Sequence, residues 1–321
     1  MRSRSLSLTG ATGFVGWHVA EAFLARGWDV RALVRRGNRK PVPSGATLVE
    51  SDLSAASVRH ACAGTDVIVH SAALIRARDE AAFKAVNVEG ARGVAAAAAD
   101  IGVRLLLISS QAAGGAGTPE APREEADLPV PVNAYGRSKL ASEEVVRSTA
   151  GLTFTILRPC AVYGPRDRGF LPLFRLARRG LFLVPSGQDA AFTLIYIGDL
   201  VRAVLLAAES ASVAGETLFV GHPEPQRGTD VLRAIAASAG RPFRPLPVPA
   251  AFFSALAALG DLSWKLGVTP LVDSGRLVEL RATGFVCSVD RARQVLGFTA
   301  ETTLDDGVAQ TALWYRAQGW L

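Results

Sequence analysis

Cysteine is scarce in this sequence of 321 residues, which contains only Cys62, Cys160 and Cys287. The three are isolated and odd in number, so they match neither the close pairs of a metal knuckle nor a disulfide framework. This scarcity predicts a reducing, cytoplasmic setting. Histidine is also rare, with four residues, and nothing gives them metal-ligand spacing. We therefore predict a protein that holds no metal ion.

Long hydrophobic runs are absent as well. The apolar stretch after the N-terminal arginines ends at once in a glycine cluster, which leaves no room for the apolar region of a secretory signal. The longest charge-free stretch, PLPVPAAFFSALAALG at 245–260, carries three prolines and is shorter than the roughly 20 apolar residues of a membrane span. We expect a mature chain that begins at Met1 and has no stable membrane insertion.

Positive charge is in moderate excess, because 35 lysines and arginines stand against 29 aspartates and glutamates. A nucleic-acid surface needs such residues gathered on one face or helix, whereas these arginines are scattered along the chain. We predict a solvated surface with a few arginines that bind an anionic small molecule, and no nucleic-acid partner.

Short β-rich runs alternate with helical stretches from Ser3 to about residue 158. This alternation predicts an α/β fold with a doubly wound parallel (Rossmann) sheet, whose nearly continuous apolar strands are covered on both faces. After Pro159 the alternation breaks, and helices are expected at about 170–180, 229–239, 249–266 and 303–317. We predict a dinucleotide-binding domain and a smaller, discontinuous C-terminal substrate domain, over 1–165 plus about 191–220 and over about 166–190 and 221–321, respectively.

Three glycines stand three residues apart near the start, in LTGATGFVG at 8–16. They lie between an apolar strand and an amphipathic helix. There Gly10 and Gly13 would let a diphosphate approach the backbone, at the positive end of the helix dipole. Gly16 would let the helix pack tightly on the sheet. An ordinary tight turn could carry the same glycines, but the strand-to-helix context favours a dinucleotide site formed by Gly10, Thr12, Gly13, Phe14, Val15 and Gly16.

The end of the next strand, RALVRRGNRK at 31–40, bears on the choice of cofactor. An NAD site usually has a carboxylate there for the ribose 2′-hydroxyl. Here that position falls near Val34, and Arg35 and Arg36 follow. Arginines pair with a 2′-phosphate. We therefore predict NADP(H) as the preferred cofactor with NAD(H) possible, the alternative being that both arginines are solvated loop residues.

The stretch NAYGRSKLASEEVV places Tyr135 and Lys139 one helical turn apart. A tyrosine with its usual pKa of about 10 is a poor acid–base catalyst, but a neighbouring ammonium group favours the phenolate. Upstream, a strand ends in Ser109 and Ser110, and a hydroxyl there could hydrogen-bond the substrate oxygen.

These motifs, with SDL, VIVHSAA, VNVEG and LRPCAVYGPRD, resemble the extended short-chain dehydrogenase/reductase family, the NAD(P)-dependent epimerase/dehydratase-like group. The resemblance covers essentially the whole chain. It implies a catalytic triad of Ser110, Tyr135 and Lys139, and a homodimer formed by the Tyr135 helix and the long helix at 79–100. The cofactor contacts that it implies beyond the glycine turn, the arginines and the triad are Asp52, Leu53, Ala72, Ala73, Asn87, Ser109, Arg158, Pro159 and Val162.

Departures from the family pattern narrow the activity. The family's dehydratases have Thr-Asp-Glu where this chain has Ser110-Gln111-Ala112, so the acid for elimination is missing. Ala161 stands where sugar-nucleotide epimerases often have asparagine, which resembles the 3β-hydroxysteroid dehydrogenase and dihydroflavonol reductase branch. The resemblance implies a hydrophobic ketone or secondary alcohol as substrate, sterol-like, polyketide-like or a long-chain β-keto compound.

Apolar residues of the C-terminal half form either a wall or lid of the substrate site or the core of the small domain; they are Phe174, Leu181, Phe252, Phe253 and Trp264. Gln111, Tyr163 and Tyr196 are further candidates for substrate contact, although the two tyrosines are as readily structural. Two other functions stay open. One is a nucleotide-sugar 4-epimerase that retains its NAD, and the other is a non-catalytic NADP(H)-binding sensor or assembly protein, which would usually lack Tyr135 or Lys139.

Overall fold

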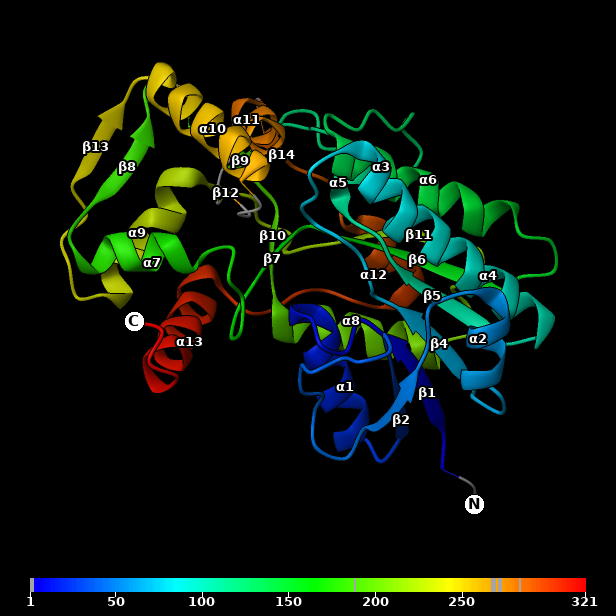
Figure 1. Ribbon diagram of the computed structural model, residues 1–321. Helices are drawn as coiled ribbons and strands as arrows, with labels where there is room; N and C mark the ends of the chain where they lie inside the picture. The colour runs from blue at the N-terminus through cyan, green and yellow to red at the C-terminus, as the bar shows by residue number, and fades with distance from the viewer. Residues whose placement is uncertain (1–2, 188, 267–269, 271–272, 283) are drawn as a thin grey trace.

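The computed structural model describes residues 3–187, 189–266, 270, 273–282 and 284–321. A sheet of seven parallel strands, in the order β11-β6-β5-β4-β1-β2-β3, forms its centre (Figure 1). From β1 the sheet is extended on one side by β2 and β3, and from β4 on the other side by β5, β6 and β11. In such sheets ligands bind beyond the carboxyl ends of the two strands where the direction changes, here β1 and β4. The strands are β1 (Ser5–Thr9), β2 (Asp29–Val34), β3 (Thr47–Glu50), β4 (Val67–His70), β5 (Arg104–Ile108), β6 (Phe154–Pro159) and β11 (Thr217–Val220).

Helices cover both faces of this sheet. In β5, Leu106 and Ile108 belong to the core on one face, whereas Leu105 and Leu107 belong to the core on the other. The first core includes α1 (Phe14–Ala25) and α8 (Ile197–Glu209), and the second includes α2 (Ala55–Ala61), α4 (Glu89–Asp100) and α6 (Ala134–Ser148). Burial on both faces explains the nearly continuous apolar strands, and the predicted doubly wound sheet is confirmed.

The long helix predicted at 79–100 is present but is not uniform. It starts with α3 (Glu80–Phe83), which is capped by the Asp79 side chain, and ends with α4. Between them lies a π-helical turn, η1 (Lys84–Val88). Single π-helical turns within α-helices are frequent at functional sites, and this one contains Asn87.

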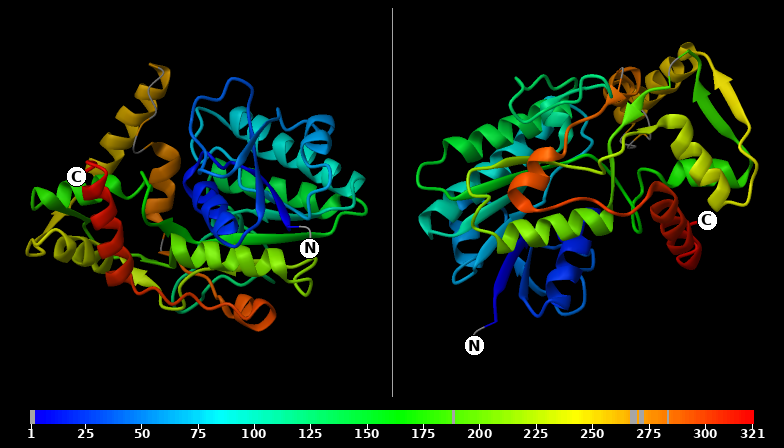
Figure 2. Two further views of the ribbon diagram at one scale, coloured as in Figure 1. Left: turned by 90° about the horizontal axis from the view of Figure 1, so that it is seen from below. Right: turned by 180° about the vertical axis from the view of Figure 1, so that it is seen from behind.

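A second core lies to one side of the sheet, around Phe174, Phe182 and Tyr315 (Figures 1 and 2). It is built by the predicted helices near 170–180, 229–239 and 303–317, which the structure places at α7 (Leu171–Arg178), α9 (Gly228–Ser238) and α13 (Leu304–Ala317). Two short parallel strands, β8 (Phe182–Pro185) and β13 (Pro245–Val248), lie at its outer edge. They lead to the predicted helix near 249–266, α10 (Ala250–Lys265), which packs on α11 (Ser274–Arg281).

The chain passes between the two cores more than once, through short strands and helices. The strands are β7 (Ala161–Tyr163), β9 (Ala191–Phe192), β10 (Leu194–Tyr196), β12 (Gln226–Arg227) and β14 (Gly284–Phe285). Helix α12 (Asp290–Leu296) and Phe298 then pack in the larger core before the chain reaches α13. The predicted domain boundaries remain a prediction.

Within the described ranges, no helix combines the length and apolar character that crossing a membrane would need.

Candidate active site

The glycine-rich turn joins β1 to α1. Gly10 has a φ of +80°, and a Cβ there would lie 2.8 Å from the backbone nitrogen of Ala72. A Cβ on Gly16 would lie 2.2 Å from the carbonyl oxygen of Gly10. The tight helix packing predicted at Gly16 is thus confirmed. Gly13 is exposed at the N-cap, where no side chain caps α1 and no acidic residue lies in its first turn, an arrangement that suits an anion.

The loop after β4 is held beside this turn by buried hydrogen bonds. The Thr9 hydroxyl accepts from the backbone N–H of Ala72 (3.1 Å) and is hydrogen-bonded to Nδ1 of His70 (2.7 Å). The Asn87 side chain accepts from the N–H of Leu74 (2.7 Å) and donates to its carbonyl (3.0 Å) and to the Ser138 hydroxyl (2.9 Å). Asn87 therefore ties the loop that contains the predicted cofactor residues Ala72 and Ala73 to helix α6.

Acid should destabilise the fold through His70, which is buried. Burial, aided by the charge of Lys139, lowers the pKa of His70 from 6.5 to about 3. Between these pH values His70 is protonated in the unfolded chain and neutral in the native state. The free energy of unfolding therefore falls by up to about 1.4 kcal/mol per pH unit as the pH drops below the unfolded-state pKa of His70. Above that pKa it does not change through this group.

The variant His70→Asn, which keeps an acceptor for Thr9, lacks this dependence. In urea titrations, the difference in unfolding free energy between wild type and variant should be about 2 kcal/mol smaller at about pH 5 than at about pH 7. A difference that does not change with pH would contradict the assignment.

Arg35 and Arg36 follow the last residue of β2 and are exposed. Among the described residues, neither side chain has an ion-pair partner. The neighbouring strand β3 leads to Asp52, which is exposed and accepts from the N–H of Ser54 (2.9 Å), and to Leu53, whose φ is +66°. The ends of β2 and β3 therefore offer two free guanidinium groups near the predicted adenine contacts.

Helix α6 carries Tyr135 and Lys139 past the short helix α5 (Gln111–Gly114). Asn133 caps α6, because its side chain accepts from the N–H of Gly136 (2.8 Å). A Cβ on Gly136 would lie 2.4 Å from the carbonyl oxygen of Ala112, so only glycine permits this approach. Ser110 caps α5 and accepts from the N–H of Ala112 (3.2 Å). The contact between the two helices thus brings the neighbourhoods of Ser110 and Tyr135 together.

Lys139 lies one turn after Tyr135 and is buried. Its ammonium group donates to the carbonyl oxygen of Ile108 (2.7 Å), the last residue of β5 before Ser109 and Ser110. Burial lowers the pKa of Lys139 to about 8, against the opposing effect of the Glu143 carboxylate. The predicted triad thus lies where the carboxyl end of β5 meets the start of α6.

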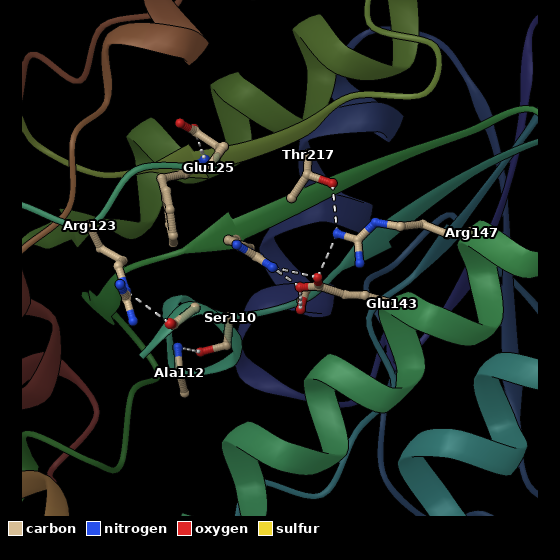
Figure 3. Close-up of polar contacts among 11 residues, drawn as sticks. Ser110, Ala112, Arg123, Glu125, Glu143, Arg147 and Thr217 are labelled. Carbon is tan, nitrogen blue, oxygen red and sulfur yellow. Dashed lines mark hydrogen bonds and ion pairs between the residues drawn. The ribbon is translucent and has the colours of Figure 1, made fainter. Parts of the chain in front are cut away.

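Next to this site lies an ionic network centred on the buried Glu143, shown in Figure 3. Its carboxylate accepts from Nε and Nη2 of Arg158 (2.9 and 2.8 Å), from the Ser109 hydroxyl (2.5 Å) and from Arg147 (2.8 Å). Arg147 also donates to the Thr217 hydroxyl (3.0 Å). Burial opposes the charge on Glu143, but these hydrogen bonds and the charge of Arg158 hold its pKa below the usual range.

Sequence analysis missed Glu143, although a carboxylate one helical turn after Lys139 was the available signal. It also assigned Arg158 and Ser109 to the cofactor. In the structure both side chains are held by Glu143 inside the fold, and their contact with a cofactor stays a prediction.

Comparison with known proteins now identifies the family. The sequence profile of the NAD dependent epimerase/dehydratase family matches residues 6–221. The chain belongs to this family. This match confirms the resemblance found in the sequence. Together with the fold, it indicates an enzyme of the extended short-chain dehydrogenase/reductase class.

Three similar proteins illustrate the range of this epimerase/dehydratase family. Ceramide reductase of Caulobacter vibrioides is 33% identical over 320 residues, covering 98% of this chain and 96% of the relative. A 4-hydroxy-2-methyl-3-oxo-4-farnesyl-3,4-dihydroquinoline-1-oxide ketoreductase of Stigmatella aurantiaca is 30% identical over 317 residues, covering 94% and 93%. The structure of MoeE5 in complex with UDP-glucuronic acid and NAD matches with a TM-score of 0.76 and 26% identity, covering 98% and 99%.

In this family member Gln111 directly follows Ser110 and is buried. Its side-chain Nε2 has no hydrogen-bond partner among the described residues. A buried donor without an acceptor costs free energy, and a bound cofactor or substrate would supply one. Gln111 as a ligand contact stays a prediction.

The other residues predicted to contact the substrate differ in their burial and contacts. Tyr163 is buried in the smaller core, where its ring contacts Phe170, and the Tyr196 hydroxyl donates to Gln310 (2.9 Å). Both tyrosines therefore have packing roles. Of the five apolar residues left open between wall and core, Phe174 lies in that core, whereas Leu181 and Phe252 are exposed and Phe253 and Trp264 are half-buried.

The interpretation of all three cysteines as isolated is wrong for two of them. The sulfur atoms of Cys160 and Cys287, 127 residues apart in sequence, lie 3.1 Å from each other in a buried cluster with Phe219. Both are free thiols. Among the described residues, no group of three or more His, Cys, Asp or Glu side chains is placed to hold a metal ion.

Proposed function

We propose that this family member is an NADP(H)-dependent oxidoreductase that interconverts a hydrophobic ketone and its secondary alcohol. The observation that carries the proposal is the position of Ser110, Tyr135 and Lys139, where α6 crosses α5 at the carboxyl end of β5. Two similar proteins, the ceramide reductase and the farnesyl-quinoline ketoreductase, act on lipophilic compounds by their names, which favours a substrate of that class.

The residues present fit a dinucleotide. The proposed contacts of its diphosphate are the amides of the Gly10–Gly16 turn, and those of its 2′-phosphate are Arg35 and Arg36. Gln111 offers an unsatisfied donor at the other end. When bound, the nicotinamide supplies or accepts the hydride. The other proposed contacts are Thr12, Phe14, Val15, Asp52, Leu53, Ala72, Ala73, Asn87, Pro159 and Val162, with backbone contacts of Ser109.

In the proposed reaction, Ser110 and Tyr135 hydrogen-bond the substrate oxygen and polarise the carbonyl group. Tyr135 gives its phenolic proton to that oxygen during reduction and takes one back during oxidation. Lys139, held against Ile108, contacts the nicotinamide ribose and favours the ionised phenol through its charge. The Asn87 hydrogen bonds to Leu74 and Ser138 fix the loop after β4 relative to helix α6.

The main alternative is a nucleotide-sugar epimerase, favoured by the solved relative that holds UDP-glucuronic acid and NAD. It predicts that NAD stays bound through purification and that no nicotinamide is consumed. A non-catalytic NADP(H) sensor is disfavoured because Tyr135 and Lys139 are both present. We also propose a cytoplasmic homodimer that uses α4 and α6, which pack side by side at one edge of the molecule (Figure 1).

The test is a panel of ketones assayed with NADPH and with NADH by nicotinamide absorbance. We expect lipophilic ketones to oxidise NADPH in preference to NADH. Arg35→Ala should raise KM for NADPH by about tenfold or more, because a charge-assisted hydrogen bond contributes about 1.5–3 kcal/mol. It should leave KM for NADH unchanged. The control is Arg39→Ala, an exposed arginine of the same loop. Equal use of both cofactors by the wild type would refute the arginine argument.

A further inference from the structure

The described side chains on the solvent-facing side of helix α10 are apolar. Among its described side chains, every exposed one is alanine, leucine or phenylalanine, and Leu266 continues the pattern just after the helix. Ordinary surface helices expose their polar face. The exposed residues are Ala250, Ala251, Phe252, Ala255, Leu256, Ala258, Leu259 and Leu262. We call this set, with Leu266, the outer face of α10.

The polar residues of α10 whose side chains are described are less exposed than these. Ser254, Asp261 and Ser263 are half-buried. The Asp261 carboxylate accepts from the N–H of Ser274 at the start of α11 (3.0 Å), and the Ser263 hydroxyl bonds within its own helix. The side that faces the protein is apolar too, since Ala257 is buried and Phe253 is half-buried. A helix that is apolar all round is typical of one surrounded by protein or lipid.

Two segments that build the smaller core and its outer edge are rich in arginine. Residues 168–187 and 231–260 contain four and three arginines, respectively, and no aspartate or glutamate. The two segments lie together because β8 pairs with β13. Among the described residues of these segments, six exposed arginines form no ion pair, and four of them precede β8 and β13 in the chain; these four are Arg178, Arg179, Arg241 and Arg244. Leu181 and Leu246, in or next to these strands, are exposed as well.

We propose that the outer face of α10 and these arginines dock the protein on the surface of a lipid bilayer with anionic headgroups. Apolar side chains on a helix of 16 residues suit a position in the interfacial plane, and the arginines that precede β8 and β13 in the chain would pair with lipid phosphates. A second copy is the weaker occupant. A second copy carries the same unpaired arginines around its smaller core and would be repelled by them, whereas anionic lipid attracts them.

The docking face lies next to the candidate active site. Helix α11, on which α10 packs, reaches Asn133 at the start of the catalytic helix, since the Asn133 side chain donates to the carbonyl of Gly275 (3.5 Å). A lipophilic ketone dissolved in the bilayer would thus enter beside Tyr135 without crossing water. This delivery rests on the proposed function, whereas the docking itself does not.

Vesicle flotation tests the docking with the purified full chain. We expect binding to vesicles of phosphatidylcholine and phosphatidylglycerol, weaker binding to phosphatidylcholine alone, and loss of the difference at high salt. Leu259→Glu should weaken binding by about tenfold or more. Leu313→Glu on α13 is the matched control, because the exposed fractions of the two leucines are 65% and 64%. It should bind as the wild type does.

Three results would overturn the docking: no flotation of the wild type, equal flotation of both variants, or a change in oligomeric state with Leu259→Glu in light scattering, which would assign the face to a second copy. A failure of the proposed function can be told apart from a failure of the docking. Turnover of a short, water-soluble ketone with NADPH is measured without vesicles, and Leu259→Glu should leave it unchanged. A protein that floats through Leu259 but reduces no ketone would refute the oxidoreductase proposal alone.

Discussion

Replacing Tyr135 with phenylalanine should lower kcat/KM for ketone reduction by about 10²–10⁴-fold, the usual contribution of a positioned general acid. The variant keeps the ring that contacts Phe83 and loses only the hydroxyl. NADPH affinity, measured by fluorescence titration, should stay within about twofold, because the loss falls on the transition state.

A second tyrosine controls for stability. The Tyr315 hydroxyl donates to the carbonyl of Asp167 (2.7 Å) in the smaller core. Tyr315→Phe therefore removes a buried hydrogen bond, which contributes about 0.5–1.5 kcal/mol, at a place far along the chain from the triad. It should lower thermal stability and leave kcat intact. Full activity of Tyr135→Phe would refute the assigned chemistry.

Replacing Glu143 with glutamine should destabilise the fold by about 3–5 kcal/mol, because it leaves the buried Arg158 guanidinium without a counter-ion. The substitution preserves the shape of the side chain and removes its charge. Urea unfolding followed by circular dichroism measures the effect. Ser109, which donates to Glu143, would lose its charged acceptor in the same variant.

The adjacent residue provides the control. Glu144 is on the same helix but exposed, so Glu144→Gln should change stability by no more than about 0.5 kcal/mol. Similar losses for the two variants would mean that Glu143 acts through helix charge and not through the buried pair. A second comparison, Arg158→Met, removes the cation and should relieve part of the penalty in the double variant.

Much of the fold followed from local patterns. Continuous apolar runs between helices indicated strands covered on both faces, and the glycine spacing placed the β1–α1 turn. Gly16 shows why the motif is readable: any side chain there would collide with the Gly10 carbonyl oxygen. The position of Tyr135 and Lys139 on one helix was likewise a matter of spacing alone.

Contacts between distant segments were harder to read. Glu143 meets Arg158 and Ser109 only because α6, β5 and β6 pack together, and helix periodicity says nothing of such partners. Helix α12 is short and mostly polar, so its sequence, DRARQVL, gives little periodic signal. The apolar stretch at 245–260 was noticed, but composition could not show that its leucines point outward.

The path of the chain between its two cores has a practical consequence. After the segment with α7 and β8, the chain re-enters the larger core through α8 and β11, leaves it again for α9, α10 and α11, and comes back once more through α12 before α13. The smaller core of a relative could therefore not be transferred into this protein as one continuous segment. A working chimera would need three separate segments to be exchanged, with five splices, each made where the backbone crosses from one core to the other.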